Sequence, residues 1–116
     1  MTAAYQDALE RVSMIRGLRG AMLVSASDGL VVAESLMEGV DGRAVAALAA
    51  SLAGRLRRTT ESAGLQPPRL IHLRAERGSV LAVPAADDLL VVAVARPDAN
   101  LGLARLEMIE AAERLG

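Results

Sequence analysis

The chain contains no cysteine, lysine, phenylalanine or tryptophan, and it has one histidine and one tyrosine. Without cysteine it can form neither disulfides nor thiolate metal sites, which fits a reducing compartment. Without lysine it lacks the side chain that reaches the nucleotide phosphates in a P-loop, so we do not expect such a GTPase or ATPase. With 13 scattered arginines, a net charge of −1 and almost no stacking aromatics, we also expect no nucleic-acid binding.

Long apolar runs are absent as well. The longest, such as residues 89–95, fall far short of the roughly 20 residues that a membrane-spanning helix needs. The first 16 residues lack the basic start and apolar block of a signal peptide. At 116 residues, the chain is expected to be one cytoplasmic domain over 1–116 that inserts into no membrane.

Patterns that carry catalysis or bind metals are scarce. Ser51 lacks the flanking glycines of a nucleophile elbow, and His72 is the only imidazole. The adjacent carboxylates Asp87 and Asp88 fall in an expected turn, where acidic residues are common. We therefore predict a protein that is not an enzyme and has no cofactor and no metal site.

Apolar periodicity and turn residues predict eight elements. Helices are expected at 2–16, 41–63 and 100–115, and strands at 21–26, 30–33, 69–76, 79–83 and 89–95. Asp28-Gly29 predicts a tight hairpin turn, Asp41 an N-cap and Gly64 the residue that follows a helix end. The α-β-β-α-β-β-β-α order predicts an α+β fold. A five-stranded antiparallel sheet would carry the long helix on one face and both terminal helices on the other.

The long helix, Asp41 to Ala63, has two apolar stripes on a helical wheel. The stripe predicted to face the sheet contains mostly large residues: Val45, Leu48, Ala49, Leu52 and Leu56. A second stripe contains only small ones: Ala46, Ala47, Ala50, Ala53 and Gly54. Because small residues permit close approach of another backbone, the second stripe predicts docking against a partner. Gly54 has an alternative explanation, in which it only makes an exposed helix slightly less stable.

Two further features each allow two interpretations. Arg55, Arg57 and Arg58, near the end of the long helix, either complement its negative end or supply an arginine finger for phosphoryl transfer. His72, on the polar side of strand 69–76, is either a plain exposed residue or lies near its own copy across a two-fold axis. In the second case its protonation would weaken the pairing.

Four segments together suggest a family. They are the strand Gly20–Val24, the turn and return Ser27–Val32, the Ala-rich helix Ala44–Leu56, and the helix start Asn100–Arg105. In this order and spacing they resemble the Roadblock / dynein light chain family, and the resemblance covers nearly the whole chain.

The resemblance implies a non-enzymatic protein that forms dimers and shares the profilin-like sheet. The middle strand of this family pairs with its copy in a second subunit, and the long helices lie near each other. On this chain these elements are Leu70–Ala75 and Asp41–Ala63. The implied interface residues are Ala46, Ala47, Ala50, Ala53, Gly54, Arg57, Leu70, His72 and Arg74. Bacterial members, a gliding-motility GTPase regulator among them, are associated with small Ras-like GTPases.

The leading hypothesis is therefore a homodimeric regulator or scaffold that binds a small Ras-like GTPase. One alternative is a small-ligand sensor of the profilin or PAS kind, although such sensors usually enclose a pocket lined by bulky and aromatic groups. A generic dimerisation module is the other. Activation, recruitment and simple scaffolding of the GTPase are equally compatible with the sequence.

Overall fold

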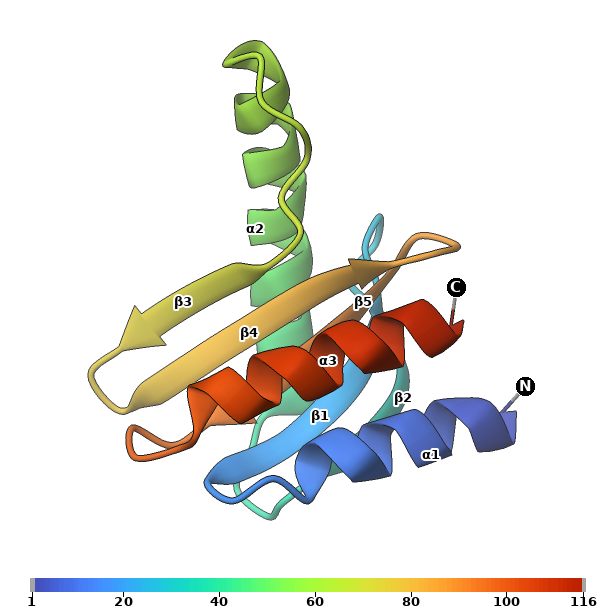
Figure 1. Cartoon of the computed structure of the whole chain (residues 1–116), viewed down its shortest axis with the longest axis vertical. Coiled ribbons are helices and arrows are strands. Elements are labelled where there is room, and N and C mark those ends of the chain that lie inside the picture. Colours follow the sequence, from blue (N-terminus) through green and yellow to red (C-terminus); the bar gives the residue numbers. More distant parts are fainter. Residues whose placement is uncertain (1, 116) are drawn as a thin grey trace.

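A computed structural model describes residues 2–115 as three helices and a five-stranded antiparallel sheet. The sheet has the strand order β2-β1-β5-β4-β3 (Figure 1). In chain order the elements are α1 (Thr2–Ser13), β1 (Leu18–Ser25), β2 (Val31–Leu36), α2 (Gly42–Ser62), β3 (Ile71–Ala75), β4 (Gly78–Ala85), β5 (Leu89–Ala95) and α3 (Leu101–Leu115). The predicted element order and antiparallel sheet are confirmed.

The ends of α2 have the predicted caps. The side chain of Asp41 accepts a hydrogen bond from the backbone N–H of Ala44 at 3.1 Å, so it satisfies one of the free donors of the first turn. At the other end, Gly64 has a φ of +78°. Its N–H donates to the carbonyl of Glu61, and that of Leu65 donates to the carbonyl of Thr60. These two bonds form a Schellman motif, which ends the helix before the Pro67-Pro68 pair.

Two hairpin turns meet at one end of the sheet. The β4–β5 turn contains Asp87 and Asp88, both with φ near +60°, a conformation that Asp tolerates better than most residues. Asp88 also holds the β1–β2 turn: its carbonyl accepts from the N–H of Ala26 at 2.8 Å, and its carboxylate accepts from that of Ser27 at 3.0 Å. The two turns are therefore fixed to each other.

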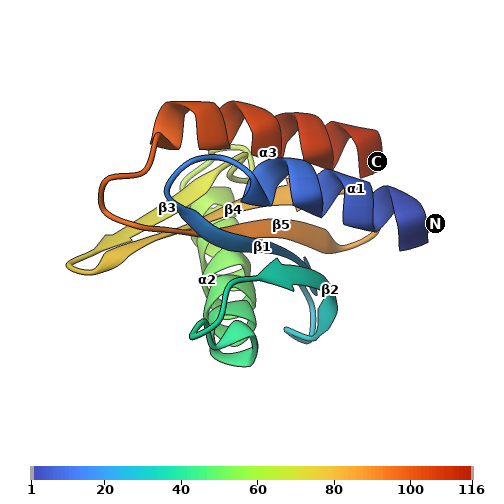
Figure 2. The ribbon, with the colours of Figure 1, turned by 90° about the horizontal axis from the view of Figure 1, so that it is seen from below.

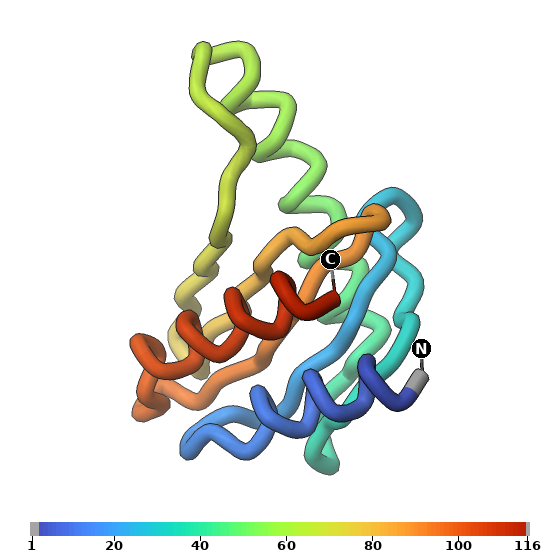
Figure 3. Tube along the Cα trace, turned by 45° about the vertical axis from the view of Figure 1, so that its right-hand side comes forward, coloured from blue at the N-terminus to red at the C-terminus, as the bar shows by residue number. Residues whose placement is uncertain are grey.

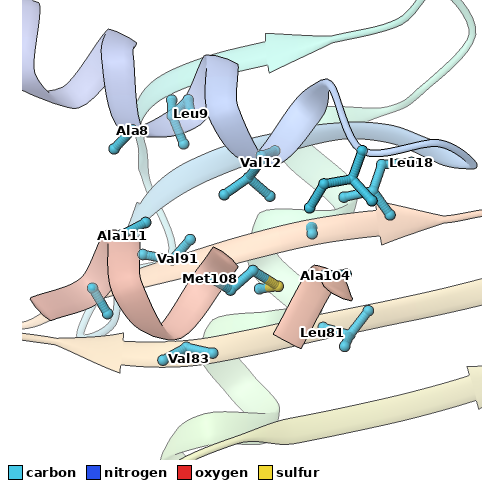
Figure 4. Packing of buried hydrophobic residues seen from close by; sticks show 14 of the residues in the cluster. Ala8, Leu9, Val12, Leu18, Leu81, Val83, Val91, Ala104, Met108 and Ala111 are labelled. Carbon is cyan, nitrogen blue, oxygen red and sulfur yellow. The ribbon is translucent and has the colours of Figure 1, made fainter. Parts of the chain in front are cut away.

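The sheet separates two hydrophobic cores, as Figure 2 shows. Helices α1 and α3 lie side by side on one face, where Leu9, Val12 and Met108 are fully buried against Leu81 and Val91 (Figure 4). Helix α2 covers the other face, above a cluster that contains Met22, Val24, Leu90 and Val92. The predicted assignment of helices to the two faces is confirmed.

Helix α2 crosses the strands steeply, and its C-terminal half extends beyond the sheet (Figures 1 and 3). Its 21 residues span about 32 Å at 1.5 Å per residue. The three buried residues of the helix, Ala46, Ala49 and Ala50, all lie in its first half. From the far end, residues 64–70 return to the sheet at β3.

Several predicted boundaries are wrong by a few residues. The first helix ends at Ser13 rather than at residue 16, and β1 begins at Leu18 rather than at residue 21. The reason is pairing, since Leu18 and Gly20 lie opposite Ala95 and Val94 of β5. The partner strand therefore extends β1 beyond its apolar run.

Candidate interaction surface

Strand β3 forms one edge of the sheet. It pairs only with β4, so its other backbone edge has no strand beside it. Ile71 is buried, but the other four residues of β3 are exposed. An open strand edge can accept another strand through backbone hydrogen bonds, and this feature makes β3 the first component of a candidate interaction surface.

The second component is one side of α2, here called the leucine flank: Val45, Leu48, Leu52 and Leu56. Leu48 is 44% exposed, and the other three are half-buried. The opposite side of the helix lies against the β1–β2 turn, because a Cβ added to Gly29 would lie 3.6 Å from the Cα of Ala47. The leucine flank therefore points toward the β3 edge.

Two apolar side chains of the sheet continue this surface. Leu73 of β3 is 36% exposed and lies opposite Val80, which is half-buried. Both project to the α2 side of the sheet, because Leu73 alternates with His72, whose register partner Leu81 belongs to the opposite core. The leucine flank, Leu73 and Val80 together form what we call the β3–α2 surface.

The orientation of α2 corrects the predicted roles of its two stripes. Ala46 has no exposed surface and Ala50 is 8% exposed, so both pack on the chain's own sheet rather than on a free face. Leu48, predicted to face the sheet, points outward. The sheet presents bulky Met22 and Leu90 beneath the helix, and small helix residues fit above such side chains where leucine would not.

Of the remaining predicted stripe residues, Ala53 packs at the edge of the core under α2, whereas Ala47 and Gly54 lie on the side of α2 away from the leucine flank. Ala47 is exposed, whereas Ala53 and Gly54 are half-buried. A Cβ added to Gly54 would meet only the Nη1 atom of Arg58, at 3.5 Å. Among residues 2–115, therefore, no contact requires glycine at this position.

His72 has a partner within its own sheet. Its Nε2 atom lies 3.1 Å from the hydroxyl oxygen of Ser79, a buried residue of β4 with 5% exposure. Because a hydroxyl can donate or accept, this contact is compatible with either protonation state of the imidazole. Arg74 shares the side of β3 that carries His72, and Leu70, just before the strand, packs at the border of the core below α1 and α3.

A hollow of about 400 Å³ lies on the other side of α2, where the two hairpin turns meet the returning chain. Arg57, Gly54, Pro67, Pro68 and Asp88 are among its lining residues. Of the predicted interface residues, Ala53, Gly54 and Arg57 line this hollow, next to Ile71 at the start of β3. One sequence signal could have pointed to this hollow, the Pro67-Pro68 pair, but on its own that pair indicates only the end of the helix.

The charges around this hollow are mostly solvated. Between residues 2 and 115, the ion pairs are Arg96–Asp98 and Arg114–Glu110, so no acidic partner within that range holds Arg57. Asp28, in the adjacent β1–β2 turn, has a lowered pKa, first because the backbone N–H of Leu30 donates to its carboxylate at 3.1 Å.

Clustered metal ligands are absent from the part of the chain that the structure describes: no three His, Asp or Glu side chains gather there. Nor does any described helix have the length and apolar character to cross a membrane.

Comparisons with known proteins agree with this fold. A family model described as Roadblock/LC7 domain matches residues 4–95. Uncharacterized protein MJ1340 of Methanocaldococcus jannaschii is 35% identical over 107 residues, which are 92% of each chain.

Solved structures with the same fold cover nearly the whole chain. Myxococcus xanthus MglB superposes with a TM-score of 0.86 at 16% identity, over 99% of this chain and 93% of that one. A structure described as MglB with tetrameric arrangement has a TM-score of 0.85 at 27% identity, over 97% of this chain and 88% of that one.

Proposed function

Because the chain belongs to the Roadblock/LC7 domain family, we propose that it is a non-catalytic cytoplasmic regulator. It acts as a homodimer and binds a small Ras-like GTPase. The single observation that carries the proposal is the β3–α2 surface. There an unpaired strand edge lies next to a row of large apolar side chains, of which Leu48 and Leu73 are exposed and the others are half-buried.

The two components of this surface favour the same kind of partner. A second β3 supplies the backbone donors and acceptors that the edge lacks, and a second leucine flank supplies apolar area. Two-fold symmetry makes one surface self-complementary. If the dyad passes near Leu73, the middle residue of β3, the two Leu73 side chains meet and the sheet continues through both copies.

The same geometry modifies the prediction for His72. A dyad at Leu73 brings His72 opposite Arg74 of the second copy, not opposite the second His72. Protonation of His72 would then place two cations next to each other, so acid should weaken the pairing. The Ser79 contact holds the imidazole on that side of the sheet.

The GTPase partner is supported by the family resemblance and by the likeness to MglB structures, one of which is described as a gliding protein. The chain itself has no lysine with which to build a P-loop. In the proposed complex the GTPase therefore supplies the nucleotide site, and this chain positions or regulates it.

The dimer is tested by sedimentation velocity over a dilution series. Leu73→Arg introduces a charge at the proposed dyad and should shift the protein to smaller species while its far-UV spectrum stays unchanged. Leu30→Arg is the matched control. Leu30 is 64% exposed, but it lies between β1 and β2, on the side of α2 opposite the leucine flank. A wild-type chain that sediments as a monomer at tens of micromolar would refute the dimer.

The GTPase is tested by titration with Ras-like GTPases of the source organism, each loaded with a fluorescent GDP or a non-hydrolysable GTP analogue. We expect saturable binding with a preference for one nucleotide state. A change in GTP hydrolysis on addition of the chain would indicate regulation, and binding without such a change would indicate scaffolding. No binding to any of them in either state would refute this part of the proposal.

A further inference from the structure

Helix α3 has an apolar outer face that the β3–α2 surface does not use. Its inner side is buried on the sheet through Ala104, Met108 and Ala111. On the outside, Leu103 is 43%, Leu106 is 64% and Ile109 is 38% exposed. Three exposed large apolar residues on one helix favour a partner, and the charges beside Ile109 indicate which partner fits.

Arg105, Ile109 and Glu113 are spaced four residues apart and therefore form one ridge along α3. Arg105 and Glu113 are both exposed. Neither makes an ion pair with any residue from 2 to 115, whereas Arg114 and Glu110 pair with each other within the helix at 3.5 Å. The ridge thus carries a positive end, an apolar centre and a negative end.

A ridge of this kind is complementary to itself when reversed. In an antiparallel pair with a two-fold axis at Ile109, each Arg105 lies opposite Glu113 of the other copy, and the two Ile109 side chains meet at the centre. A parallel pair would instead bring like charges together. The ridge therefore favours one occupant in one orientation, a second copy of α3.

The space beside the ridge permits this approach. A hollow of about 590 Å³ runs between α3 and the chain around Pro67–Arg69, and Ile109 and Glu113 line it. Gly102 precedes Leu106 by one turn on the adjacent ridge, and a Cβ added there would meet only the side-chain oxygen of Asn100, at 3.6 Å. The outer face is therefore open at Gly102.

We propose that the outer face of α3 is a second self-association surface, in which the Arg105–Ile109–Glu113 ridges of two copies pair antiparallel. This surface lies on the α1 and α3 side of the sheet, whereas the β3–α2 surface lies at the β3 edge on the α2 side (Figure 2). The two surfaces can therefore be occupied together, and copies that use both form assemblies larger than a dimer.

Charge reversal tests this pairing directly. In Arg105→Glu or Glu113→Arg alone, each copy carries two like charges on the ridge, so self-association through α3 should weaken about tenfold or more. An equimolar mixture of the two variants restores both opposite-charge pairs, because the ridge with two glutamates then faces the ridge with two arginines. The mixture should recover the wild-type assembly, which no loss of folding could produce.

The readout is sedimentation mass at low and high salt, with Arg114→Glu as a control of equal charge change outside the ridge. Wild type should exceed the dimer mass, and each reversal should stop at the dimer held by β3. Leu73→Arg should stop at a dimer held by α3, and Leu73→Arg combined with Arg105→Glu should be a monomer. If the copies pair through α3 but not through β3, the wild-type mass is that of a dimer. In that case Leu73→Arg leaves the mass unchanged, and Arg105→Glu reduces it to that of a monomer.

Two results would overturn the α3 pairing, whether or not the copies also pair through β3. One is a wild-type mass that neither reversal lowers. The other is a mixture of the two reversed variants that associates no better than each variant alone.

Discussion

The two sides of α2 differ in both size and exposure. The side that faces the sheet carries Ala46, Ala49 and Ala50, all buried, whereas the leucine flank carries Leu48, which is 44% exposed. The helical wheel alone places Leu48 inside and Ala46 and Ala50 outside, and these three residues are reversed in the structure, whereas Ala49 is buried as predicted. The available space beneath a helix, and not hydrophobicity alone, therefore decides which apolar side is buried.

Physically, the sheet below α2 already fills the core. Met22, Val24 and Val92 are fully buried there, so a helix carrying only small residues can approach closely and leave no void. Leucines on the same side would push the helix outward. Of the large residues of α2, Leu48 is therefore the one left mainly exposed for a partner, while Val45, Leu52 and Leu56 still pack partly on the core.

The largest expected effect comes from a charge on the buried side. Ala46→Arg should reduce the free energy of unfolding by about 3–5 kcal/mol or prevent folding, because an unpaired charge enters a packed core. Urea denaturation measures the loss. The adjacent, exposed Ala47→Arg should change the same quantity by no more than about 0.5 kcal/mol; equal effects of the two variants would invalidate the comparison.

A smaller effect is expected on the leucine flank. Leu48→Ala should weaken self-association by about 2 kcal/mol, since both copies lose an apolar contact, while the stability of the isolated subunit changes little. Dilution in sedimentation equilibrium gives the association constant. Leu30→Ala removes a leucine that is more exposed, at 64% against 44% for Leu48, and lies elsewhere, so it should leave that constant unchanged.

A substitution at Gly54, outside the leucine flank, should change stability without changing association. Because a Cβ there meets only the end of Arg58 at 3.5 Å, Gly54→Ala should raise the free energy of unfolding by about 0.5–1 kcal/mol. Association should persist, since Gly54 does not lie on the leucine flank. Stabilisation combined with a lost dimer would instead show that two helices cross closely at this glycine.

The smallest effect concerns the β1–β2 turn beside Ala47. The pKa of Asp28 lies below the ordinary 3.8, chiefly through the Leu30 N–H, so its stabilising contribution is present above 3.8 and is lost as the pH falls through the lowered value. Asp28→Asn keeps a hydrogen-bond acceptor but cannot titrate. Wild type should have a higher urea midpoint than this variant at pH 7, and the difference should become smaller at pH 3. A difference that stays constant with pH would contradict the lowered pKa of Asp28.

Much of the fold could be predicted from local chemistry. Helix caps and turns depend on residues only a few positions apart. The N-cap Asp41, the helix end at Gly64 and the turn at Asp87-Asp88 are therefore found as predicted. The rotation of α2 on the sheet could not be predicted in this way. It depends on side chains such as Met22 and Leu90, which lie far from the helix in sequence.

The candidate site was predictable to the same degree. The family resemblance implied an edge strand at Leu70–Ala75, and β3 (Ile71–Ala75) is that edge. It did not show that Leu48 and Leu73 share one surface, or that Arg57 lies in a hollow on the other side of α2, because both depend on the steep crossing of the helix.

Hydrogen–deuterium exchange of the β3 amides can decide whether the β3–α2 surface is a pairing surface. In a single chain, the N–H groups of β3 that point away from β4 have no strand to bond to and should exchange rapidly. If two copies pair through β3, these amides should be protected in concentrated wild type and lose that protection in Leu73→Arg. Rapid exchange of the outward amides in a sample whose mass exceeds that of the monomer would refute pairing through β3.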